Sequence, residues 1–311
     1  MQPIKTVIMA GGKGTRIAQD WPLLPKPMVP LCGKPILQHQ IELLVRQGLC
    51  DITLVVGHMA DKITAHFGDG AQYGARIGYV VEQAPLGTAG ALALVPRQDI
   101  LLLMGDVFLE VDFSRFLSWH REKQADITLF AHPNSHPWDS DLLVARPTGQ
   151  VQRWASKKDA ERGELRNLVN AGLYILSAHV LPTQAAPLDL DKGVVAPRIA
   201  GGGVYAYRSS EYVKDMGTPE RLAAVCRDIE NGVCAARALN NRQRAVFLDR
   251  DGVINRHEGF VTQPQQLALL PGAAEGIHRL NTSPFLAICV TNQPVVARGD
   301  VSFEGLEHIH A

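Results

Sequence analysis

At 311 residues, the chain is long enough for one large α/β domain with an appended segment, or for two domains. Lys plus Arg and Asp plus Glu number 31 each, so the net charge favours neither nucleic acid nor an acidic membrane as a partner. No apolar run is long enough for a membrane span, and no signal segment precedes the first predicted strand. We therefore expect a cytoplasmic protein with reduced cysteines, whose oligomeric state is not decided by composition.

A glycine-rich loop directly follows an apolar, β-branched stretch at residues 4–9, which predicts a buried strand. Glycines lack a Cβ, so their backbone N–H groups can approach phosphate oxygens closely, and nearby cations add charge for the same anion. A purely structural turn is the alternative, because glycine turns are common after the first strand of α/β proteins. We predict nucleotide binding by Ala10, Gly11, Gly12, Lys13, Gly14 and Thr15, and catalytic cations at Arg16 and at Lys26, which lies between two prolines.

The sequence GGKGTR at residues 11–16, followed by PKPM at residues 25–28, fits neither the P-loop nor the dinucleotide fingerprint. Together the two motifs resemble the signature of the sugar-phosphate nucleotidyltransferases. This resemblance implies an enzyme that joins a nucleoside triphosphate to a sugar 1-phosphate and releases pyrophosphate. Both reactants are anions, so positive charge and positioning would supply most of the catalysis, with Mg2+ as the expected cofactor.

Strand and helix patterns alternate through the first 230 residues. Helices are predicted at 36–45, 60–67, 86–95 and 218–229, and strands at 52–56, 77–81, 99–104 and 204–207. This alternation predicts an α/β fold with a doubly wound, mostly parallel, Rossmann-like sheet, whose ligands bind at the carboxyl ends of the strands. Further strands at 127–131, 142–145, 151–154 and 173–176, joined by polar turns, predict an antiparallel subregion that lies over the sheet and holds the sugar.

Two aspartates are candidates for a magnesium site. Asp106 comes after Gly105 at the end of a predicted strand, and Asp215 lies just before the predicted helix that contains Pro219. In isolation, each is better explained as a turn carboxylate or a helix N-cap. Mg2+ prefers one or two carboxylates together with phosphate oxygens. Both residues match the metal-binding aspartates of the sugar-phosphate nucleotidyltransferases, so the resemblance assigns the metal to them.

The remaining substrate contacts are implied by the same resemblance. Residues 82–91 are similar to the family segment that approaches the base and the sugar, although tight helix–sheet packing explains its small residues nearly as well. Gln83, Gly87 and Thr88 are predicted to bind the nucleotide, and Gly105, Lys157, Asn170 and Gly172 the sugar. The chain departs from the family at Ser156, where a glutamate usually precedes the lysine. Serine can hydrogen-bond a sugar hydroxyl but does not offer a carboxylate that binds two of them at once, so sugar affinity or specificity is expected to differ.

A second pair of motifs lies in the last part of the chain. An apolar strand at 245–248 ends in the sequence DRDG, and a later strand at 285–290 ends in TNQ. These motifs resemble motifs I and II of the haloacid-dehalogenase (HAD) phosphatases, most narrowly the heptose bisphosphate phosphatase branch. The resemblance implies Asp249 as nucleophile, Asp251 as general acid and base, and Thr291 and Asn292 as phosphate-binding residues.

Other parts that such a phosphatase needs do not follow these motifs in the sequence. A lysine to steady the nucleophile, a later acidic cluster for magnesium and a Cys/His zinc loop are missing, and about 70 residues cannot complete a doubly wound sheet. We therefore expect residues 1–235 to form the transferase domain, 236–243 a linker, and 244–311 a partial HAD-like domain in which Asp249 and Asp251 are vestigial.

The appended segment bears on the sugar, because a heptose bisphosphate phosphatase yields a heptose 1-phosphate. The expected reaction is therefore transfer from GTP to D-glycero-D-manno-heptose 1-phosphate, with mannose 1-phosphate as the next choice. Such a product would serve the synthesis of lipopolysaccharide, capsule or S-layer glycans. Two other functions stay open, a HAD-type heptose bisphosphate phosphatase and a non-catalytic protein that binds a sugar nucleotide.

Overall fold

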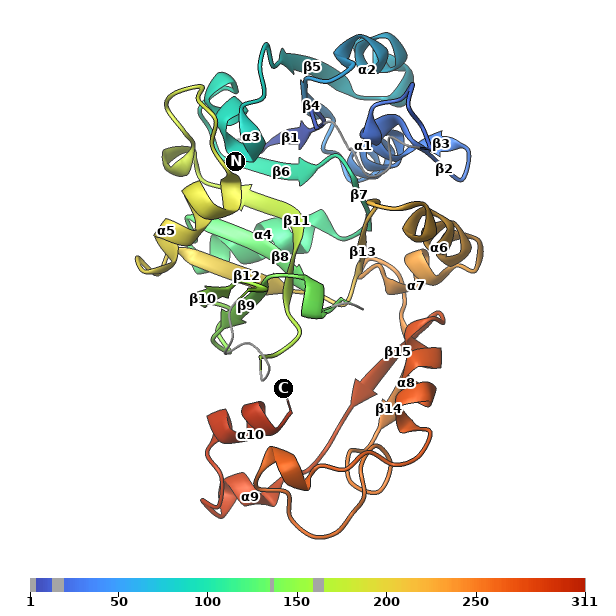
Figure 1. The fold of residues 1–311 in the computed structure, drawn as a ribbon, viewed down its shortest axis with the longest axis vertical. Coiled ribbons are helices and arrows are strands. Elements are labelled where there is room, and N and C mark those ends of the chain that lie inside the picture. Colours follow the sequence, from blue (N-terminus) through green and yellow to red (C-terminus); the bar gives the residue numbers. More distant parts are fainter. Residues whose placement is uncertain (1–3, 13–19, 135–136, 159–164, 311) are drawn as a thin grey trace.

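The computed structural model describes residues 4–12, 20–134, 137–158 and 165–310 (Figure 1). Its centre is a seven-stranded sheet in the order β12-β8-β11-β6-β1-β4-β5. The strands are β1 (Lys5–Met9), β4 (Asp51–Val56), β5 (Arg76–Val81), β6 (Ile100–Met104), β8 (Ile127–His132), β11 (Val169–Leu176) and β12 (Val204–Arg208). Only β11 runs antiparallel to its neighbours, so the predicted mostly parallel α/β sheet is confirmed.

Apolar layers cover both faces of this sheet. On one face, side chains of α1 (Ile36–Arg46), α2 (Ala60–Phe67) and α4 (Phe113–Lys123) pack in one buried cluster with Ile8 and Leu101. The adjacent strand residues Val7 and Leu102 belong to a second cluster on the opposite face. Successive side chains of a strand point to opposite faces, so strands covered on both sides read as continuous apolar runs.

One predicted helix is shorter than expected, and one helix is not predicted at all. Residues 86–95 form a four-residue helix, α3 (Gly87–Gly90), that continues as the 3-10 helix η3 (Ala91–Leu94). Gly87 has φ +73°, a left-handed conformation that does not belong inside an α-helix. The helix α4 has no counterpart among the predicted elements, although Asp112 caps it by accepting hydrogen bonds from two backbone N–H groups.

The predicted antiparallel subregion is smaller than expected. The strands expected at 127–131 and 173–176 are instead β8 and β11 of the central sheet. Both are buried along nearly their whole length. Of the four strands predicted for this subregion, only β9 (Leu142–Ala145) and β10 (Val151–Ala155) form an antiparallel pair outside the central sheet. Two further short pairs were not predicted, β2 (Pro30–Leu31) with β3 (Lys34–Pro35), and β7 (Val107–Glu110) with β13 (Tyr212–Asp215).

A third apolar cluster joins β2, β7 and β13 to α6 (Pro219–Glu230) and α7 (Val233–Arg237). Leu31, Phe108, Tyr212 and Val225 are among its buried members. Thr218 caps α6 by accepting a hydrogen bond from Arg221 N (3.4 Å). This cluster fixes the beginning of α6 against the end of β13, which matters for the site described below.

The last part of the chain forms a β–α–β unit at the lower end of Figure 1. The parallel strands β14 (Arg244–Leu248) and β15 (Phe285–Cys289) are connected through α8 (Ala273–Asn281), and α9 (Pro294–Ala297) and α10 (Phe303–Ile309) follow. Little of this unit is buried, and Phe247 is 69% exposed. An ion pair of 2.8 Å between Arg166 and Glu307 connects it to the first part of the chain.

None of the helices in the described part of the chain is both long and apolar enough to cross a membrane.

Candidate active site

The carboxyl ends of three central strands meet at one edge of the sheet. Ala10 N donates to Val55 O (2.7 Å), which ties the residue after β1 to β4. Gly105 N donates to Met9 O (2.9 Å), which ties the end of β6 to β1. Ligands of open α/β sheets bind at the carboxyl ends of the strands, so this edge is where the site is expected.

Glycines at this edge have a definite packing role. A Cβ on Gly11 would collide with Oε2 of Glu82, and one on Gly105 would lie 2.8 Å from Met9 O. Gly105 is predicted to bind the sugar. In the structure, its lack of a side chain also allows the end of β6 to lie close to β1. Gly12 is exposed, and Lys13, Gly14, Thr15 and Arg16 lie outside the described residues.

Lys26 and Asp106 form an ion pair at this edge. Lys26 begins the short 3-10 helix η1 (Lys26–Met28), whose Pro27 and Met28 are buried. The Lys26 side chain is 13% exposed, whereas the Asp106 side chain is 37% exposed. The buried flank therefore holds the cation in place, while the carboxylate it meets remains open to a ligand.

Asp215 lies on the strand next to Asp106. The antiparallel register of β13 and β7 places Asp215 opposite Val107, and Met216 N donates to Asp106 O (2.8 Å). The two aspartates predicted to bind metal are thus brought together by neighbouring chain segments. Arg221 on α6 pairs with Asp215 through both carboxylate oxygens. Arg221 is not among the residues predicted from the sequence, although its position in the first turn of α6, shortly after Asp215, could have identified it.

The carboxylates of Asp106 and Asp215 suit a divalent cation that is also held by phosphate oxygens. Mg2+ is usually bound by one or two carboxylates together with substrate phosphates and water. In the described part of the chain, no group of three or more His, Cys, Asp or Glu residues is placed to hold a metal ion. The donor set therefore fits Mg2+ that arrives with a nucleotide better than a fully protein-bound metal. Lys26 and Arg221 form ion pairs with the two carboxylates and offset their negative charge.

Residues 86–90 pack against a distant segment of the chain. Thr88 Oγ1 accepts a hydrogen bond from Leu190 N (2.7 Å), and a Cβ on Gly87 would lie 2.5 Å from Leu188 O. A Cβ on Gly90 would collide with Ala186 O. These contacts support the structural explanation for the small residues here. Gln83, Gly87 and Thr88 are nevertheless exposed.

A hydrogen-bonded network joins Asn170 and Tyr174 of β11 to Asp191, and Asn170 is one of the residues predicted to bind the sugar. Asn170 Nδ2 donates to the Tyr174 hydroxyl (2.6 Å), which donates to Asp191 Oδ1 (2.9 Å). Gly172, with φ +74°, allows the bulge that lets Asn170 Oδ1 accept from Gly172 N (3.1 Å). Asp191 was missed in the sequence, because it lies in the π-helix η7 (Asp191–Val195), far along the chain from Asn170.

The carboxyl group of Asp191 has an unusual protonation equilibrium. Burial, together with the nearby carboxylates of Asp189 and Asp141, raises its pKa from 3.8 to about 6, against the lowering effects of the Tyr174 hydrogen bond and of Lys192. Asp191 is therefore largely ionised at neutral pH and becomes protonated in mildly acidic solution. Perturbed carboxyl groups of this kind are concentrated at functional sites.

Lys157 and Ser156 belong to the turn after β10. Lys157 N donates to Asp141 Oδ1 (2.9 Å), and Lys157 Nζ pairs with Asp139 (3.0 Å). Ser156 Oγ accepts a hydrogen bond from Lys158 N (3.3 Å). Leu142, Ala155 and Val169 pack in one small apolar cluster, which places this turn beside the beginning of β11, the strand that carries Asn170.

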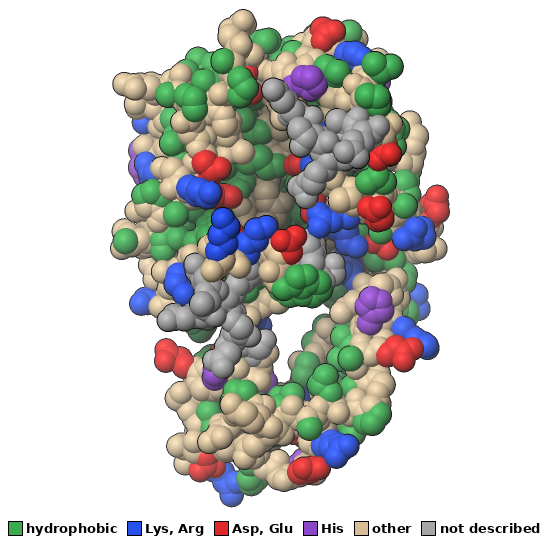
Figure 2. Space-filling model, viewed as in Figure 1, with side chains coloured by type: hydrophobic (Ala, Val, Ile, Leu, Met, Phe, Trp, Pro, Cys, Tyr) green, Lys and Arg blue, Asp and Glu red, His purple; other side chains and the backbone are tan. Residues whose placement is uncertain are grey.

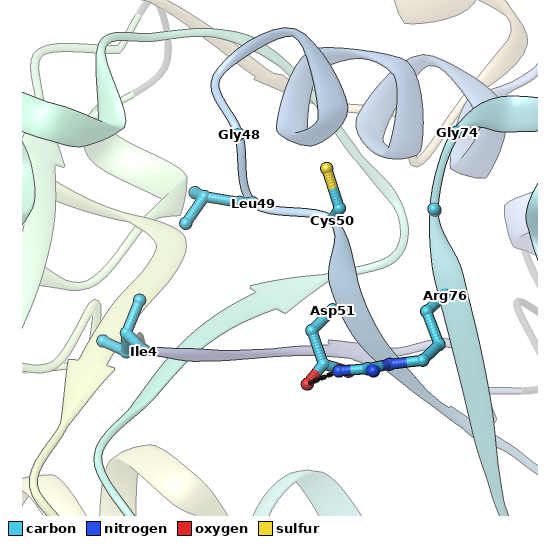
Figure 3. A pocket seen from close by; sticks show the side chains of 8 residues that line it. Ile4, Gly48, Leu49, Cys50, Asp51, Gly74 and Arg76 are labelled. Carbon is cyan, nitrogen blue, oxygen red and sulfur yellow. Dashed lines mark hydrogen bonds and ion pairs between the residues drawn. The ribbon is translucent and has the colours of Figure 1, made fainter. Parts of the chain in front are cut away.

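Charged side chains gather around a hollow in the middle of the face shown in Figure 2, in the region where Figure 1 places β6, β11 and β13. A second hollow, shown in Figure 3, lies at the amino ends of β4 and β5 and is lined by Cys50, Asp51 and Arg76 among others. There Asp51 is already paired with Lys5 and Arg76. The charged hollow, at the carboxyl ends, is the better candidate for the active site.

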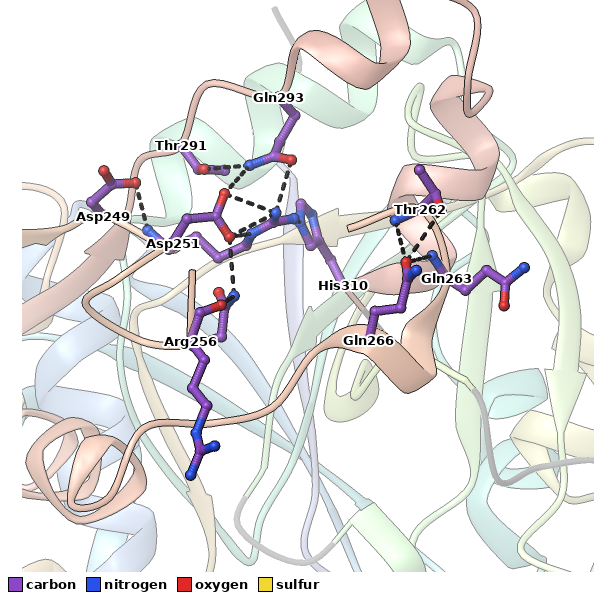
Figure 4. A network of polar contacts seen from close by, with 11 residues as sticks. Asp249, Asp251, Arg256, Thr262, Gln263, Gln266, Thr291, Gln293 and His310 are labelled. Atoms are coloured by element: carbon purple, nitrogen blue, oxygen red, sulfur yellow. Dashed lines mark hydrogen bonds and ion pairs between the residues drawn. The ribbon is translucent and has the colours of Figure 1, made fainter. Parts of the chain in front are cut away.

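The C-terminal unit contains a separate polar cluster at the ends of β14 and β15 (Figure 4). Arg250 is buried and binds both oxygens of Asp251 (3.0 and 2.9 Å). Gln293 Nε2 donates to both Asp251 Oδ2 and Thr291 Oγ1 (2.8 Å each), so the structure brings these two predicted residues together. Gln293, Asn255 and Arg250 hold the pKa of Asp251 below its usual value, against the effect of burial.

The other two predicted phosphatase residues have lesser places in this cluster. Asp249 accepts a hydrogen bond from Arg250 N (2.7 Å). Asn292, predicted to bind phosphate, is exposed, and the neighbouring Gln293 makes the hydrogen bonds with Arg250 and Asp251.

The fold and the charged edge define an α/β protein built to bind a nucleotide at a pair of carboxylates and cations. A family model described as nucleotidyl transferase matches residues 5–232, and the chain belongs to this family. This confirms the family predicted for the first segment. The match does not extend to the C-terminal unit, where the HAD resemblance gains no support.

Similar proteins support the same assignment. The chain is 29% identical over 281 residues to a mannose-1-phosphate guanylyltransferase of Mycobacterium tuberculosis, covering 88% of this chain and 75% of the relative. It is 30% identical over 240 residues to mannose-1-phosphate guanyltransferase beta-A of Xenopus laevis, covering 74% of this chain but only 64% of the relative. The crystal structure of HddC from Yersinia pseudotuberculosis complexed with GMP-PN has the same fold, with a TM-score of 0.61, 24% identity, and coverage of 73% of this chain and 99% of HddC.

Proposed function

We propose that this protein transfers a nucleotidyl group from GTP to a sugar 1-phosphate, releasing pyrophosphate and an NDP-sugar, in a Mg2+-dependent reaction. The observation that carries the proposal is the meeting of Lys26, Asp106, Asp215 and Arg221 at the carboxyl edge of the sheet. Relatives named as mannose-1-phosphate guanylyltransferases support GTP as the donor. Pyrophosphate release that requires both a triphosphate and a sugar 1-phosphate tests it.

Charge placement explains how these residues would promote the reaction. The sugar phosphate oxygen attacks the α-phosphorus while pyrophosphate leaves in line, so two anions must be held in contact. Asp106 and Asp215 would hold the ion, which supplies positive charge at the phosphate oxygens. Lys26 would leave Asp106 and bind a phosphate oxygen instead. Arg16, in the loop at residues 10–16, would supply a second positive charge.

The other predicted residues are divided between the nucleotide and the sugar. We assign the nucleotide to residues 10–15 together with Gln83, Gly87 and Thr88, and the sugar to Gly105, Lys157, Asn170 and Gly172. For the sugar, D-glycero-D-manno-heptose 1-phosphate and mannose 1-phosphate are the two candidates. The named relatives support mannose, whereas the HAD resemblance of the C-terminal unit supports the heptose.

Asp191 is proposed as the carboxylate that Ser156 does not provide. Its Oδ1 already accepts hydrogen bonds from the Tyr174 hydroxyl and, at 3.4 Å, from Asn170 Nδ2. Sugar hydroxyls are donors of the same kind, and a carboxylate can accept two of them. Asp191 therefore replaces, from another element, the acceptor that this family usually has before the lysine.

Asp191→Asn is expected to raise the KM for the sugar 1-phosphate about tenfold, the effect of one charge-assisted hydrogen bond. The KM for the triphosphate should not change. Because the pKa of Asp191 is about 6, the wild-type sugar KM should rise as the pH falls through 6, and the variant should lack this rise. Steady-state kinetics from pH 5 to pH 8 measure both effects.

Asp189→Asn is the matched control, because Asp189 is a neighbouring carboxylate outside the Asn170 network. The raised folded-state pKa of Asp191 stabilises the fold at low pH, and this contribution is lost as the pH rises through about 6. Asp191→Asn should therefore be at least as stable as the wild type at pH 8. If Asp191→Asn and Asp189→Asn had the same KM for the sugar 1-phosphate, the proposed role of Asp191 in sugar binding would be wrong.

For the C-terminal unit, we propose a partial HAD-like domain over residues 244–311, separated from a transferase domain of residues 1–235 by a linker at 236–243. The shared hydrogen bonds of Asp251 and Thr291 with Gln293 support this reading. Arg250 binds both oxygens of Asp251, and the hydrogen bonds that lower its pKa favour the ionised form over the protonated form that a general acid needs. The unit is therefore proposed to be inactive as a phosphatase.

No Mg2+-dependent hydrolysis of a heptose bisphosphate is expected from the purified protein. Released phosphate is measured for the wild type and for Asp249→Asn, which removes the predicted nucleophile. The two proteins should give the same background rate. Hydrolysis by the wild type that disappears in Asp249→Asn would contradict the proposal and establish the phosphatase.

A further inference from the structure

Two cysteines that are far apart in the sequence lie side by side next to the active site. Cys32 is in the turn between β2 and β3, and Cys226 lies on α6. Their sulfur atoms are 2.7 Å apart, and Cys32 N donates to Cys226 Sγ over 3.2 Å. A disulfide bond, with its sulfur atoms about 2.05 Å apart, needs only a small further approach.

The turn that holds Cys32 is unusual for this residue type. Cys32 has φ +48° and Gly33 φ +82°, which is the pattern of a tight hairpin turn that favours Asn, Asp or Gly at its first position. A non-glycine residue in this region is uncommon, and such positions are concentrated where function requires them. Leu31 and Val225, the neighbours of the two cysteines, are buried in one apolar cluster, which holds the hairpin against α6.

We propose that Cys32 and Cys226 form a reversible intramolecular disulfide when the protein meets a peroxide. The Cys226 thiolate attacks one oxygen of hydrogen peroxide, the O–O bond breaks, and the departing hydroxide takes up a proton to become water. The Cys32 sulfur then attacks the sulfenic acid, the S–O bond breaks, and a second water leaves with the Cys32 proton. Two electrons pass from the thiols to the peroxide, and a dithiol reductant reverses the step.

The surroundings of the pair assign the order of attack. Cys32 is exposed and Cys226 is partly buried, so a small oxidant can reach them. Desolvation and the contact with Cys226 raise the pKa of the Cys32 thiol to about 12. Cys32 Sγ donates to Cys226 Sγ over 2.7 Å, so Cys226 is the first nucleophile and Cys32 resolves the sulfenic acid.

The disulfide would join the two segments that carry the charges of the active site. The hairpin follows η1, which holds Lys26, and α6 carries Arg221, which pairs with Asp215. In the proposed reaction, Lys26 and Arg221 must leave their carboxylate partners and bind phosphate oxygens. A crosslink between their segments is therefore expected to slow turnover. This consequence rests on the proposed function, whereas the formation of the bond does not.

Mass spectrometry of the full chain tests the bond directly. In a Cys289→Ser background, which removes the other exposed thiol, peroxide should lower the intact mass by about 2 Da. Digestion should yield a peptide that links Cys32 to Cys226 and disappears on reduction. Cys32→Ser and Cys226→Ser should abolish the mass change, while Cys50→Ser should leave it unchanged.

Two results would overturn the proposal. The absence of the linked peptide from the oxidised Cys289→Ser protein, or a mass decrease of about 2 Da that persists after Cys226→Ser, would show that the pair does not form the bond. For the effect on turnover, kcat should fall severalfold on oxidation and recover with dithiothreitol. A linked peptide with unchanged pyrophosphate release would overturn that effect. If the protein released no pyrophosphate even when reduced, the proposed function would have failed, and the mass change would still decide the bond.

Discussion

Replacing Asp106 or Asp215 by alanine is expected to lower kcat at least about a hundredfold, with the fold retained. Removal of one preorganised electrostatic group from an active site typically costs this much or more. Each aspartate is proposed to hold the Mg2+ that carries charge to the triphosphate, and neither belongs to an apolar cluster. Steady-state pyrophosphate release, with circular dichroism to verify folding, measures the effect.

Asp51→Ala is the matched control for these variants. Asp51 is also a partly exposed aspartate in ion pairs with basic side chains, but it lies at the opposite end of the strands, in the hollow of Figure 3. Its loss should change kcat less than twofold. Rates near the wild-type value in both Asp106→Ala and Asp215→Ala would remove the metal assignment.

Replacing Lys26 by methionine is expected to lower kcat/KM about a hundredfold. Methionine keeps an unbranched apolar side chain against the buried flank of η1 but removes the charge that would meet a phosphate oxygen. Because Lys26 is paired with Asp106 and is only 13% exposed, its position is fixed before substrate arrives. Initial rates with varied GTP measure the effect.

Lys34→Met provides the comparison for Lys26. Lys34 is on the neighbouring hairpin, is 48% exposed and pairs with Glu42, so it supplies a similar charge away from the proposed triphosphate site. Exposed ion pairs of this kind contribute little to stability. Equal rates in Lys26→Met and Lys34→Met would exclude a direct role for Lys26.

Most of the sheet could be predicted from the sequence, because its strands are covered on both faces. The first strand, the strands at 52–56 and 77–81 and the helix at 60–67 follow from apolar runs and their spacing. The same runs could not show that β8 and β11 join this sheet. A strand buried on both faces has the same local pattern wherever it pairs, and its pairing depends on distant residues.

The charged edge was partly predictable and partly hidden. Asp106 and Asp215 are predicted as metal ligands because one follows a predicted strand, the other precedes a predicted helix, and both lie in motifs that match the family. Asp191 and the pairing of Cys32 with Cys226 could not be found, since each depends on contacts between segments far apart in the chain. Helix α4, in contrast, carried a signal that was overlooked, because Phe113, Phe116 and His120 are buried at helical spacing after a capping aspartate.

The central claim is tested most directly by pyrophosphate release with Mg2+, crossing GTP, ATP, CTP, UTP and dTTP against heptose, mannose and glucose 1-phosphates. We predict release with GTP together with D-glycero-D-manno-heptose 1-phosphate or mannose 1-phosphate, and none when either substrate or Mg2+ is left out. Release from GTP confined to glucose 1-phosphate would contradict the proposed sugar. The absence of release from every pair, with the protein folded, would contradict the transferase itself and favour a non-catalytic protein that binds a sugar nucleotide.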